Sequence, residues 1–354
     1  MDKKKLAVLF GGCSTEYTVS LHSAFSVLTN LDAEKYEIIP IGITREGEWY
    51  RYYGTYDKLM DDTWADTQAE LVAVAVSPSR SVHGIVELGR AGAATTRIDY
   101  AFPVLHGKNG EDGTVQGLFE LAGIPVIGCG TLSSALCMDK DRAHKLSALA
   151  GVAAPKAVTI QIYEREQAQE MTADLTYPLF VKPVRAGSSY GITKIERPEE
   201  LIAAVDLAFE HDSQVIVEEN VDGFEVGCAV IGISDLTVGR VDEIELKHGF
   251  FDYAEKYERA SAEIHMPARI DADTERRIQE AAKTVYRALD CSGFARVDLF
   301  LTPSGEIVFN EVNSIPGLTT MSRFPNMLKG VGISFPEMLE KLIGLYDTCE
   351  VESH

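Results

Sequence analysis

The chain is short of positive charge and has no long hydrophobic run. Its 54 acidic residues outnumber 33 lysines and arginines, for a formal net charge of −21. Without a basic stripe to replace phosphate counterions, neither a nucleic acid nor an anionic membrane is expected as a partner. No apolar stretch approaches the ~20 residues of a membrane span, and the run at 6–10 is too short for a signal peptide. We therefore expect a cytoplasmic protein.

Cysteine is sparse as well, and its spacing excludes two kinds of site. No two cysteines form a CxxC pair, which argues against a zinc site or a disulfide framework. We expect the cysteines to be small buried side chains in a reducing compartment. They are Cys13, Cys129, Cys137, Cys228, Cys291 and Cys349.

The length and the alternation of patterns predict a multidomain α/β protein. At 354 residues, 45% of them apolar, the chain has room for two or three domains. Strand-like runs lie at 6–10, 38–43, 98–105 and 124–128, and helical runs follow the first and third of them. This order predicts a parallel sheet with helices on both faces. Residues 53–97 have no clear pattern and are expected to form an irregular insertion.

The most informative segment spans residues 291–325 and predicts a β-hairpin. Two apolar runs flank Thr302–Gly305, which has the composition of a tight turn. With the turn centred between residues 303 and 304, Arg296 would lie opposite Glu311 and Asp298 opposite Phe309. The alternation of side chains then gives two faces. One carries Arg296, Asp298, Glu311 and Asn313, and the core face carries Val297, Leu299, Leu301, Val308 and Val312.

The polar face of this hairpin has the chemistry of a metal site. Two carboxylates beside an amide oxygen form a hard ligand set suited to Mg²⁺, the companion of nucleotide phosphates. A solvated charged face is the alternative, because charged residues are usually exposed. The apolar neighbours on both faces favour burial, where unpaired carboxylates are costly. We therefore expect Asp298, Glu311 and Asn313 to hold metal.

Two glycine-rich segments are candidates for anion binding. Gly11-Gly12 follows the first strand and places N–H groups at a helix N-terminus, although the full dinucleotide-binding pattern is absent. Glu16 in the same loop suits an ammonium ligand or an N-cap equally well. Lys182 precedes the small-residue loop 185–191, whose amides can approach phosphate oxygens closely.

Other candidates are weaker when taken alone. A helix is expected from a serine cap at 133 or 134 through to residue 150, and it carries Lys140, which offers a second ammonium or is simply a surface lysine. Glu218 and Glu219 end an apolar strand where they could meet adenine and ribose. The aromatic loop 248–257 is either an ordinary packed loop or a lid that closes over a site.

Together these segments resemble a known family. The motifs are LFGGCSTEYTVS, LHGKNGEDGTVQG, SSALCMDK, FVKPVRAGSSYG, FFDYAEKY, ARVD and FNEVNSIPG. In this order they resemble the D-alanine–D-alanine ligases of the ATP-grasp superfamily, and most of all the vancomycin-resistance relatives of the D-alanine–D-serine type. The resemblance implies a three-domain ATP-grasp fold of the α/β class with a Rossmann-like N-terminal domain. The implied domains are 1–138 for the first D-alanine, 139–217 as the central ATP-grasp domain, and 218–354 with the metal site and lid.

The resemblance also implies a role for each candidate residue. ATP would be bound by Lys140, Lys182, Ser189, Glu218, Glu219, Val221, Glu225 and Phe250. Catalysis would involve Glu16, Ser188, Tyr257, Arg296 and Gly317, the first three as a hydrogen-bonded link that latches the lid. The substrates would contact His106, Lys256, Ser322 and Arg323. Asp298, Glu311 and Asn313 would hold two Mg²⁺ ions, or Mn²⁺ in their place.

The implied activity is ATP-dependent joining of two D-amino acids through an acyl phosphate, for peptidoglycan precursors. Arg323 stands where housekeeping ligases carry an apolar residue, and Lys256-Tyr257 is kept where D-lactate-type enzymes carry a histidine-bearing segment. D-serine is thus favoured as second substrate, with D-alanine next and D-lactate less so, and a homodimer is expected. A nicotinamide dehydrogenase and a non-catalytic nucleotide sensor are the alternatives. The incomplete glycine pattern disfavours the first, and the filled catalytic positions disfavour the second.

Overall fold

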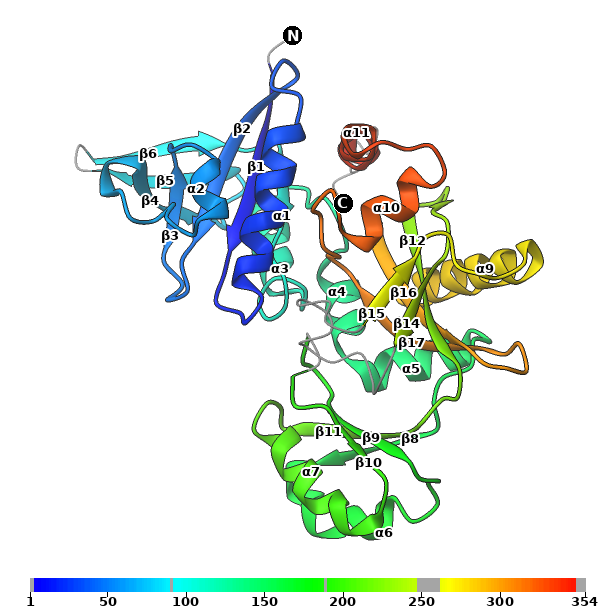
Figure 1. The fold of residues 1–354 in the computed structure, drawn as a ribbon. Coiled ribbons are helices and arrows are strands. Elements are labelled where there is room, and N and C mark those ends of the chain that lie inside the picture. Colours follow the sequence, from blue (N-terminus) through cyan, green and yellow to red (C-terminus); the bar gives the residue numbers. More distant parts are fainter. Residues whose placement is uncertain (1–2, 90–91, 188–189, 247–261, 348–354) are drawn as a thin grey trace.

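The protein is built on three β-sheets arranged along the chain (Figure 1). The structure is a computed structural model that describes residues 3–89, 92–187, 190–246 and 262–347. Within these residues the first sheet has seven strands in the order β6-β5-β4-β3-β2-β1-β7. The second has the order β10-β9-β11-β8, and the third the order β15-β14-β12-β16-β17 with β13 paired to β12. The predicted α/β class is confirmed.

The first sheet has a parallel centre formed by its most apolar strand. β1 (Lys4–Gly11) pairs in parallel with β2 (Tyr36–Ile43) and β7 (Tyr100–Pro103). The side chains at 6–10 are fully buried, as expected for a strand covered on both faces. β1 leads into α1 (Tyr17–Asn30), and α3 (Thr114–Ala122) follows the loop after β7.

The expected irregular insertion at 53–97 is wrong, because it contains three β-strands. Four antiparallel strands extend the sheet, which is therefore mixed. They are β3 (Trp49–Tyr52), β4 (Leu71–Val76), β5 (Gly84–Gly89) and β6 (Gly92–Arg97), with short turns of helix at α2 (Asp57–Met60) and η1 (Gln68–Glu70). The sequence of β6, GAATTR, is small and mostly exposed, so it carries no apolar alternation that would have revealed an edge strand.

Two further expectations near the end of this unit need correction. The single helix expected at 133–150 is two helices, α4 (Thr131–Met138) and α5 (Lys140–Leu149). Asp139 separates them and caps α5 by accepting a 3.0 Å hydrogen bond from the Arg142 amide. The strand expected at 124–128 is reduced to one bridge between Ala101 and Val126.

The second sheet is small and antiparallel. It is formed by β8 (Ala157–Gln161), β9 (Leu179–Pro183), β10 (Thr193–Ile195) and β11 (Gln214–Glu219). The helical segments here are η2 (Ile162–Gln167), α6 (Ala168–Met171), η3 (Pro198–Glu200) and α7 (Leu201–Phe209). In Figure 1, α6 and α7 lie on the side of this sheet that is turned away from the third sheet. The opposite face is therefore directed toward the third sheet.

The third sheet carries the hairpin that the sequence predicted. Its strands are β12 (Phe224–Gly232), β13 (Thr237–Val238), β14 (Asp242–Leu246), β15 (Ala262–His265), β16 (Gly293–Leu301) and β17 (Ile307–Asn313). Helix α9 (Ala272–Ala288) packs against it through the fully buried Ile278, Ala282 and Val285. Two helices follow the hairpin, α10 (Arg323–Lys329) and α11 (Phe335–Asp347).

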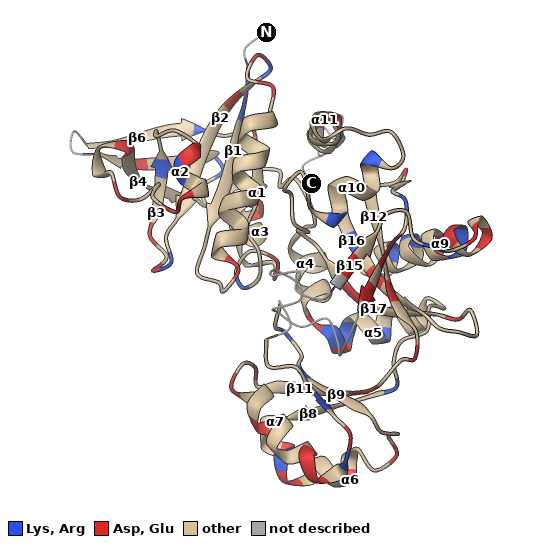
Figure 2. Cartoon of the chain, viewed as in Figure 1, with Lys and Arg blue, Asp and Glu red and all other residues tan. Residues whose placement is uncertain are grey.

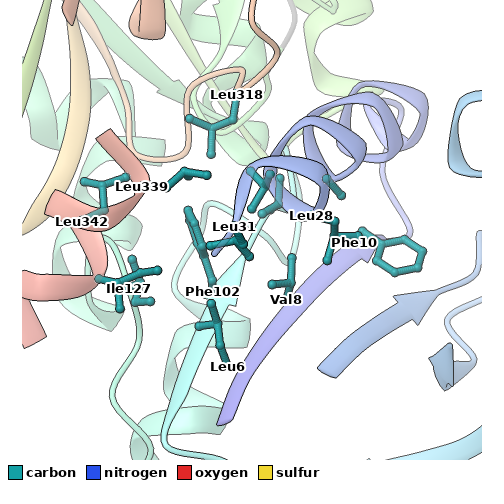
Figure 3. Close-up of a cluster of buried hydrophobic side chains, with 14 of the residues drawn as sticks. Leu6, Val8, Phe10, Leu28, Leu31, Phe102, Ile127, Leu318, Leu339 and Leu342 are labelled. Atoms are coloured by element: carbon teal, nitrogen blue, oxygen red, sulfur yellow. The ribbon is translucent and has the colours of Figure 1, made fainter. Parts of the chain in front are cut away.

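One hydrophobic cluster joins the first sheet to the C-terminal helices. Figure 3 shows Val8 of β1 and Leu28 of α1 in the same cluster as Leu318, Leu339 and Leu342. Apolar burial is worth roughly 25 cal/mol per Å². The cluster therefore stabilises the contact between segments that lie some 300 positions apart in sequence.

The cysteines agree with the prediction in four of the five described cases. Cys129, Cys137, Cys228 and Cys291 are free and buried, whereas Cys13 is exposed in the loop after β1, against expectation. Cys349 lies outside the described residues. Among the described helices, none has both the length and the apolar character required to cross a bilayer.

Candidate active site

The β16–β17 hairpin places its carboxylates opposite each other, in a register different from the one expected. Arg296 pairs with Asn313 and Asp298 pairs with Glu311, not with Phe309. The register shifts between Asp298 and Leu299, where a bulge inserts an extra residue in β17. The bulge brings two candidate metal ligands onto directly facing positions.

The same bulge corrects the expected core face. Phe309 pairs with Leu299 and belongs to the hydrophobic cluster beneath the sheet, whereas Val308 pairs with Phe300. Val308 therefore lies on the polar side of the hairpin, although it is buried there. Asp298 and Glu311 still share one face, as predicted.

Asp298 is the most constrained of the predicted ligands. Its carboxylate is 1% exposed and accepts hydrogen bonds from Arg296 Nε at 2.8 Å and Nη2 at 2.7 Å. The Asn313 amide nitrogen donates to it at 2.9 Å, which leaves the Asn313 amide oxygen to serve as a ligand. Burial lowers the pKa of Arg296, but the Asp298 charge more than compensates, so the net pKa is raised.

Arg323 joins this site from the start of α10. Its Nε and Nη2 donate to the Asp242 carboxylate at 2.7 and 2.8 Å, and Nη1 donates to Glu225 at 3.1 Å. Nη2 also lies 3.5 Å from Asp298. A side chain at Gly227 would meet this guanidinium, since an added Cβ would lie 2.4 Å from Nη2. Glycine therefore makes room for the pair.

We refer to Arg296, Arg323, Asp242, Asp298 and Glu225 as the arginine cluster. Burial lowers the pKa of Arg323, but Asp242 and Asp298 raise it well above its ordinary value. The expectation that Arg323 would contact a substrate did not include this bidentate pair with the buried Asp242.

The donor set on this face fits divalent cations. With their ordinary charges, Asp242, Asp298, Glu225 and Glu311 carry four negative charges against two on the arginines, and the remaining excess favours a cation. The three predicted ligands offer oxygen atoms alone, as Mg²⁺ prefers. Asp298, Glu311 and Asn313 are therefore the residues that would hold it.

A cleft of about 500 Å³ lies between the second and third sheets. We call it the central cleft. Figure 2 shows lysine and arginine positions on both of its sides, on α5 and on the strands of the second sheet. Seven of the predicted site residues line it, namely Lys140, Lys182, Glu218, Glu219, Val221, Glu225 and Glu311. Segments that are widely separated in sequence thus meet in one place.

The two lysines predicted to bind ATP, Lys140 and Lys182, have partners in this structure. Lys182 Nζ lies 2.6 Å from the buried carboxylate of Glu218, and Lys140 Nζ donates to the Ala186 carbonyl at 2.8 Å. Burial raises the pKa of Glu218, but Lys182 and His144 together hold it below its ordinary value. A phosphate would compete with Glu218 and with the carbonyl for these ammonium groups.

Sequence reasoning missed the apolar walls of this cleft. Phe180 and Phe300 line it, as does Ile244. Phe180 lies two residues before Lys182 and Phe300 two after Asp298, so the alternation of side chains in a strand could have identified both. Flat aromatic walls beside lysines suit a ligand with an aromatic base and phosphates.

Glu16 lies in a second pocket of about 530 Å³, beside Gly107 and Gly187. It occupies the N-cap position of α1, yet its side chain makes no capping hydrogen bond. An added Cβ on Gly107 would lie 2.3 Å from its carboxylate, so this approach requires glycine. The N-cap alternative therefore loses support, and a carboxylate site for an ammonium group remains.

The loop after β17 carries the other two predicted catalytic and substrate positions. Gly317 lies against Ser322, whose hydroxyl would be 2.9 Å from a Cβ on that glycine. The Ser322 hydroxyl lies 2.7 Å from that of Thr319. The loop is connected to the N-terminal unit by His106 and Glu111. The sequence analysis assigned no role to Glu111.

Glu111 is a partly buried carboxylate that holds two backbone segments together. Its oxygens accept the Gly107 amide at 2.8 Å and the Ile315 amide at 3.1 Å. Burial and the charge of Glu16 raise its pKa to about 8 despite these two bonds. The GEDG motif could have drawn attention to it, but its distant partner could not be seen in the sequence.

Five predicted residues lie outside the described part of the chain. They are Ser188, Ser189, Phe250, Lys256 and Tyr257. The predicted lid and latch therefore stay predictions.

The chain was compared with known proteins. Residues 5–129 match the D-ala D-ala ligase N-terminus family and residues 146–344 the D-ala D-ala ligase C-terminus family. The vancomycin B-type resistance protein VanB of Enterococcus faecalis is 45% identical over 98% of this chain and 99% of its own length. A D-alanine–D-alanine ligase of Caldicellulosiruptor bescii is 42% identical over 98% of this chain and 95% of its own.

A solved structure is also similar along its whole length. The VanG D-Ala:D-Ser ligase from Enterococcus faecalis superposes with a TM-score of 0.92, at 64% identity, over 98% of this chain and all of that chain. The family matches cover both the N-terminal residues that include Glu16 and the sheet that carries Asp298. The chain therefore belongs to the D-alanine–D-alanine ligase family, whose fold is the ATP-grasp fold.

Proposed function

We propose that this protein joins D-alanine to D-serine at the expense of ATP, which it converts to ADP and phosphate. The observation that carries the proposal is the central cleft, where Lys140, Lys182 and Glu311, the last a predicted metal ligand, line the same cavity as several aromatic rings. Such a cavity can bind a nucleoside triphosphate together with Mg²⁺. Membership of the family makes D-amino acids the substrates, and the Glu16 pocket supplies a carboxylate for an ammonium group.

The first step we propose makes the D-alanine carboxylate reactive. One of its oxygens attacks the γ-phosphorus of ATP, the bond to the β-phosphate oxygen breaks, and acyl phosphate and ADP form. Lys140 and Lys182 offset the repulsion between carboxylate and phosphates, while Glu16 holds the D-alanine ammonium. Asp298, Glu311 and Asn313 would hold two Mg²⁺ ions, which neutralise phosphate charge.

The second step we propose forms the peptide bond. The free amine of the second amino acid attacks the acyl carbon and loses a proton, and the tetrahedral intermediate expels inorganic phosphate. Asp298 holds Arg296 through Nε and Nη2, which leaves Nη1 as the donor we assign to the oxyanion, together with the Gly317 amide. Ser322 would bind the second carboxylate. Water must be excluded, and we assign that task to the predicted lid with Lys256 and Tyr257.

The preference for D-serine rests on two observations. The VanG D-Ala:D-Ser ligase is 64% identical to this chain. Arg323 follows Ser322 and is held by carboxylates, so we propose that it keeps the second site polar, acting through the arginine cluster and not by direct contact. A polar site disfavours D-alanine, because its own groups lose a partner when the hydroxyl is missing. Housekeeping D-alanine–D-alanine ligation is the second candidate, since such ligases are also relatives.

Product analysis tests the proposal directly. The enzyme is incubated with ATP, Mg²⁺ and D-alanine, alone or with D-serine or D-lactate, and the products are identified by mass spectrometry. We expect D-alanyl-D-serine with stoichiometric ADP. D-Alanyl-D-alanine as the main product with both amino acids present would favour the housekeeping function, and ADP release without any ligated product would contradict ligase activity.

We also propose a homodimer that works in the cytoplasm, where ATP and peptidoglycan precursors are made, and that contributes to vancomycin resistance as VanB does by its name. Sedimentation equilibrium measures the subunit number. Titration of the ATP complex with Mn²⁺, followed by electron paramagnetic resonance, measures whether two metal ions bind.

A further inference from the structure

A buried serine of α1 is hydrogen-bonded to the loop that carries Gly317. The Ser23 hydroxyl accepts the Leu318 amide at 3.2 Å and lies 3.1 Å from His106 Nε2. His106 Nδ1 lies 2.9 Å from the Ile315 carbonyl. Ser23 is fully buried and His106 is 4% exposed, so these bonds are shielded from water. We call this set the Ser23–His106 chain.

The chemistry of the chain fixes the proton positions. The Ile315 carbonyl can only accept, so Nδ1 of His106 carries the proton. In a neutral imidazole Nε2 then accepts from the Ser23 hydroxyl, whose oxygen accepts in turn from the Leu318 amide. Burial lowers the pKa of His106, which favours this neutral form even though Glu16 opposes the shift. Every donor in the Ser23–His106 chain has an acceptor.

The Ser23–His106 chain and Glu111 hold the backbone on both sides of Gly317. Before it, Ile315 is held at its amide by Glu111 and at its carbonyl by His106. After it, Leu318 is held at its amide by Ser23. The Leu318 side chain is also fully buried in the cluster of Figure 3. The peptide unit that carries the Gly317 N–H is thus fixed at both ends.

We propose that Ser23 and His106 are positioning residues that orient the Gly317 amide toward the oxyanion of the ligation step. The proposal rests on the proposed function, in which that amide stabilises the tetrahedral intermediate. Both ring nitrogens of His106 have protein partners, so its role is to support the loop and not to contact substrate. The chain also reaches the first substrate site, because the Ser14 hydroxyl donates to the His106 carbonyl and accepts the Glu16 amide.

The consequence is a selective defect in the second step. If the Gly317 amide is misdirected, acyl phosphate still forms, but the amine captures it more slowly and water hydrolyses a larger share. Ser23→Ala should therefore lower kcat for dipeptide by about tenfold, which is less than the roughly 100- to 1000-fold loss on removing an oxyanion donor, because the Gly317 amide is misdirected and not removed. The KM for ATP should stay unchanged. The ratio of dipeptide to ADP should fall, and this ratio does not depend on how much enzyme is folded.

The test compares this ratio in the wild type and four variants, each supplied with ATP, D-alanine and the second amino acid. Ser26→Ala is the matched control, because Ser26 lies on the same helix and, among the residues that the structure describes, its hydroxyl bonds only to the His22 carbonyl of that helix. His106→Asn can still donate to Ile315 but does not reach Ser23. Its ratio of dipeptide to ADP should match that of Ser23→Ala. The ratio in the double variant should be no lower than in either single variant, as for residues that act as a unit.

The outcomes separate the two levels of the proposal. A wild-type ratio in Ser23→Ala, beside an active wild type, would overturn the positioning role and leave the ligase function intact. A lower ratio in Ser26→Ala as well would assign the effect to general loosening of α1 and would also overturn it. If the wild type itself makes no dipeptide, the proposed function fails, and the positioning role fails with it.

Discussion

Lys182 and Arg323 are both cations with little exposure, 12% and 9% of their side chains, and both are paired with acids, yet their surroundings differ. Lys182 lines the central cleft and forms one ion pair within the described residues, with Glu218 at 2.6 Å. Arg323 is held by Asp242 and Glu225 and approaches Asp298, and Asp242 is fully buried. A single ammonium contact beside a cavity can be exchanged for a phosphate oxygen. A planar guanidinium fixed by several carboxylates is a permanent part of the fold.

The difference teaches that burial and charge alone do not identify a ligand-binding cation. What separates the two sites is whether the partner can be replaced at low cost. In the central cleft an incoming anion replaces one acid, whereas in the arginine cluster it would leave several carboxylates without their cation. Four substitutions test this contrast.

The largest effect is expected at Glu311, which lines the central cleft while its cross-strand partner Asp298 belongs to the arginine cluster. Glu311→Gln removes one ligand charge and should lower dipeptide formation by more than about 100-fold, since even outer-shell changes cost 10–100-fold in metal affinity. The thermal midpoint should change little. Glu306→Gln, in the exposed turn of the same hairpin, is the control. Near-normal turnover at ordinary Mg²⁺ would contradict the metal assignment.

The second effect is at Arg323. Arg323→Leu leaves Asp242 buried without its cation and should lower the free energy of unfolding by about 3–5 kcal/mol, the usual result of breaking a buried pair. It should also shift the kcat/KM ratio toward D-alanine. The double variant Arg323→Leu/Asp242→Leu should recover stability but not the D-serine preference. An unchanged D-serine to D-alanine ratio in both variants would refute the specificity role.

The third effect concerns Lys182 and pH. Burial raises the pKa of Glu218, but Lys182 and its neighbours hold it below its ordinary value, so the pair stabilises the fold above pH ~4.3, and this stability is lost as pH falls through the lowered pKa. In Lys182→Met the effect of burial on the pKa of Glu218 dominates. The free energy of unfolding, measured in urea at pH 7, should be about 3 kcal/mol lower than in the wild type. This difference should become smaller below pH ~4.

The control for that experiment is Lys194→Met. Lys194 also lines the cleft, but it pairs with the exposed Glu196 and is 35% exposed. It should change neither the unfolding free energy nor its pH dependence. If Lys182→Met behaved in the same way, Glu218 would not depend on its lysine.

The smallest effect is expected for an ion pair that has good hydrogen-bond geometry but is exposed to water. Arg165 binds Asp206 through two hydrogen bonds of 2.6 Å, with both side chains more than 40% exposed. Solvent screening makes such pairs weak. Arg165→Ala should leave the urea midpoint and kcat unchanged. A loss comparable to that of Arg323→Leu would show that bidentate geometry, and not burial, determines the difference.

The sequence predicted what depends on local pattern. The hairpin, its shared acidic face and the lysine before a small-residue loop all follow from alternation and turn composition over short stretches. The register did not follow, because the bulge after Asp298 leaves no mark in composition. The strand β6 was missed because its small exposed residues have no apolar period.

Contacts between distant segments were beyond such reasoning. Arg323 and Asp242 are 81 positions apart, and Leu318 and Ser23 are 295 apart. Nothing near Asp242 indicates that its partner begins a later helix. The resemblance to a family supplied roles for single residues, but the backbone bonds that hold the Gly317 loop became visible only in three dimensions.

The cluster of Figure 3 has a consequence for the order of events during synthesis. Val8 and Leu28 are made long before Leu339 and Leu342, yet all four share one core. A ribosome adds residues from the N-terminus at about 5–20 per second, so this apolar face of β1 and α1 stays uncovered for many seconds. During that time the nascent chain exposes a surface that holdase chaperones can bind. The first sheet can form early, but the covering of this face waits until the last helix is made.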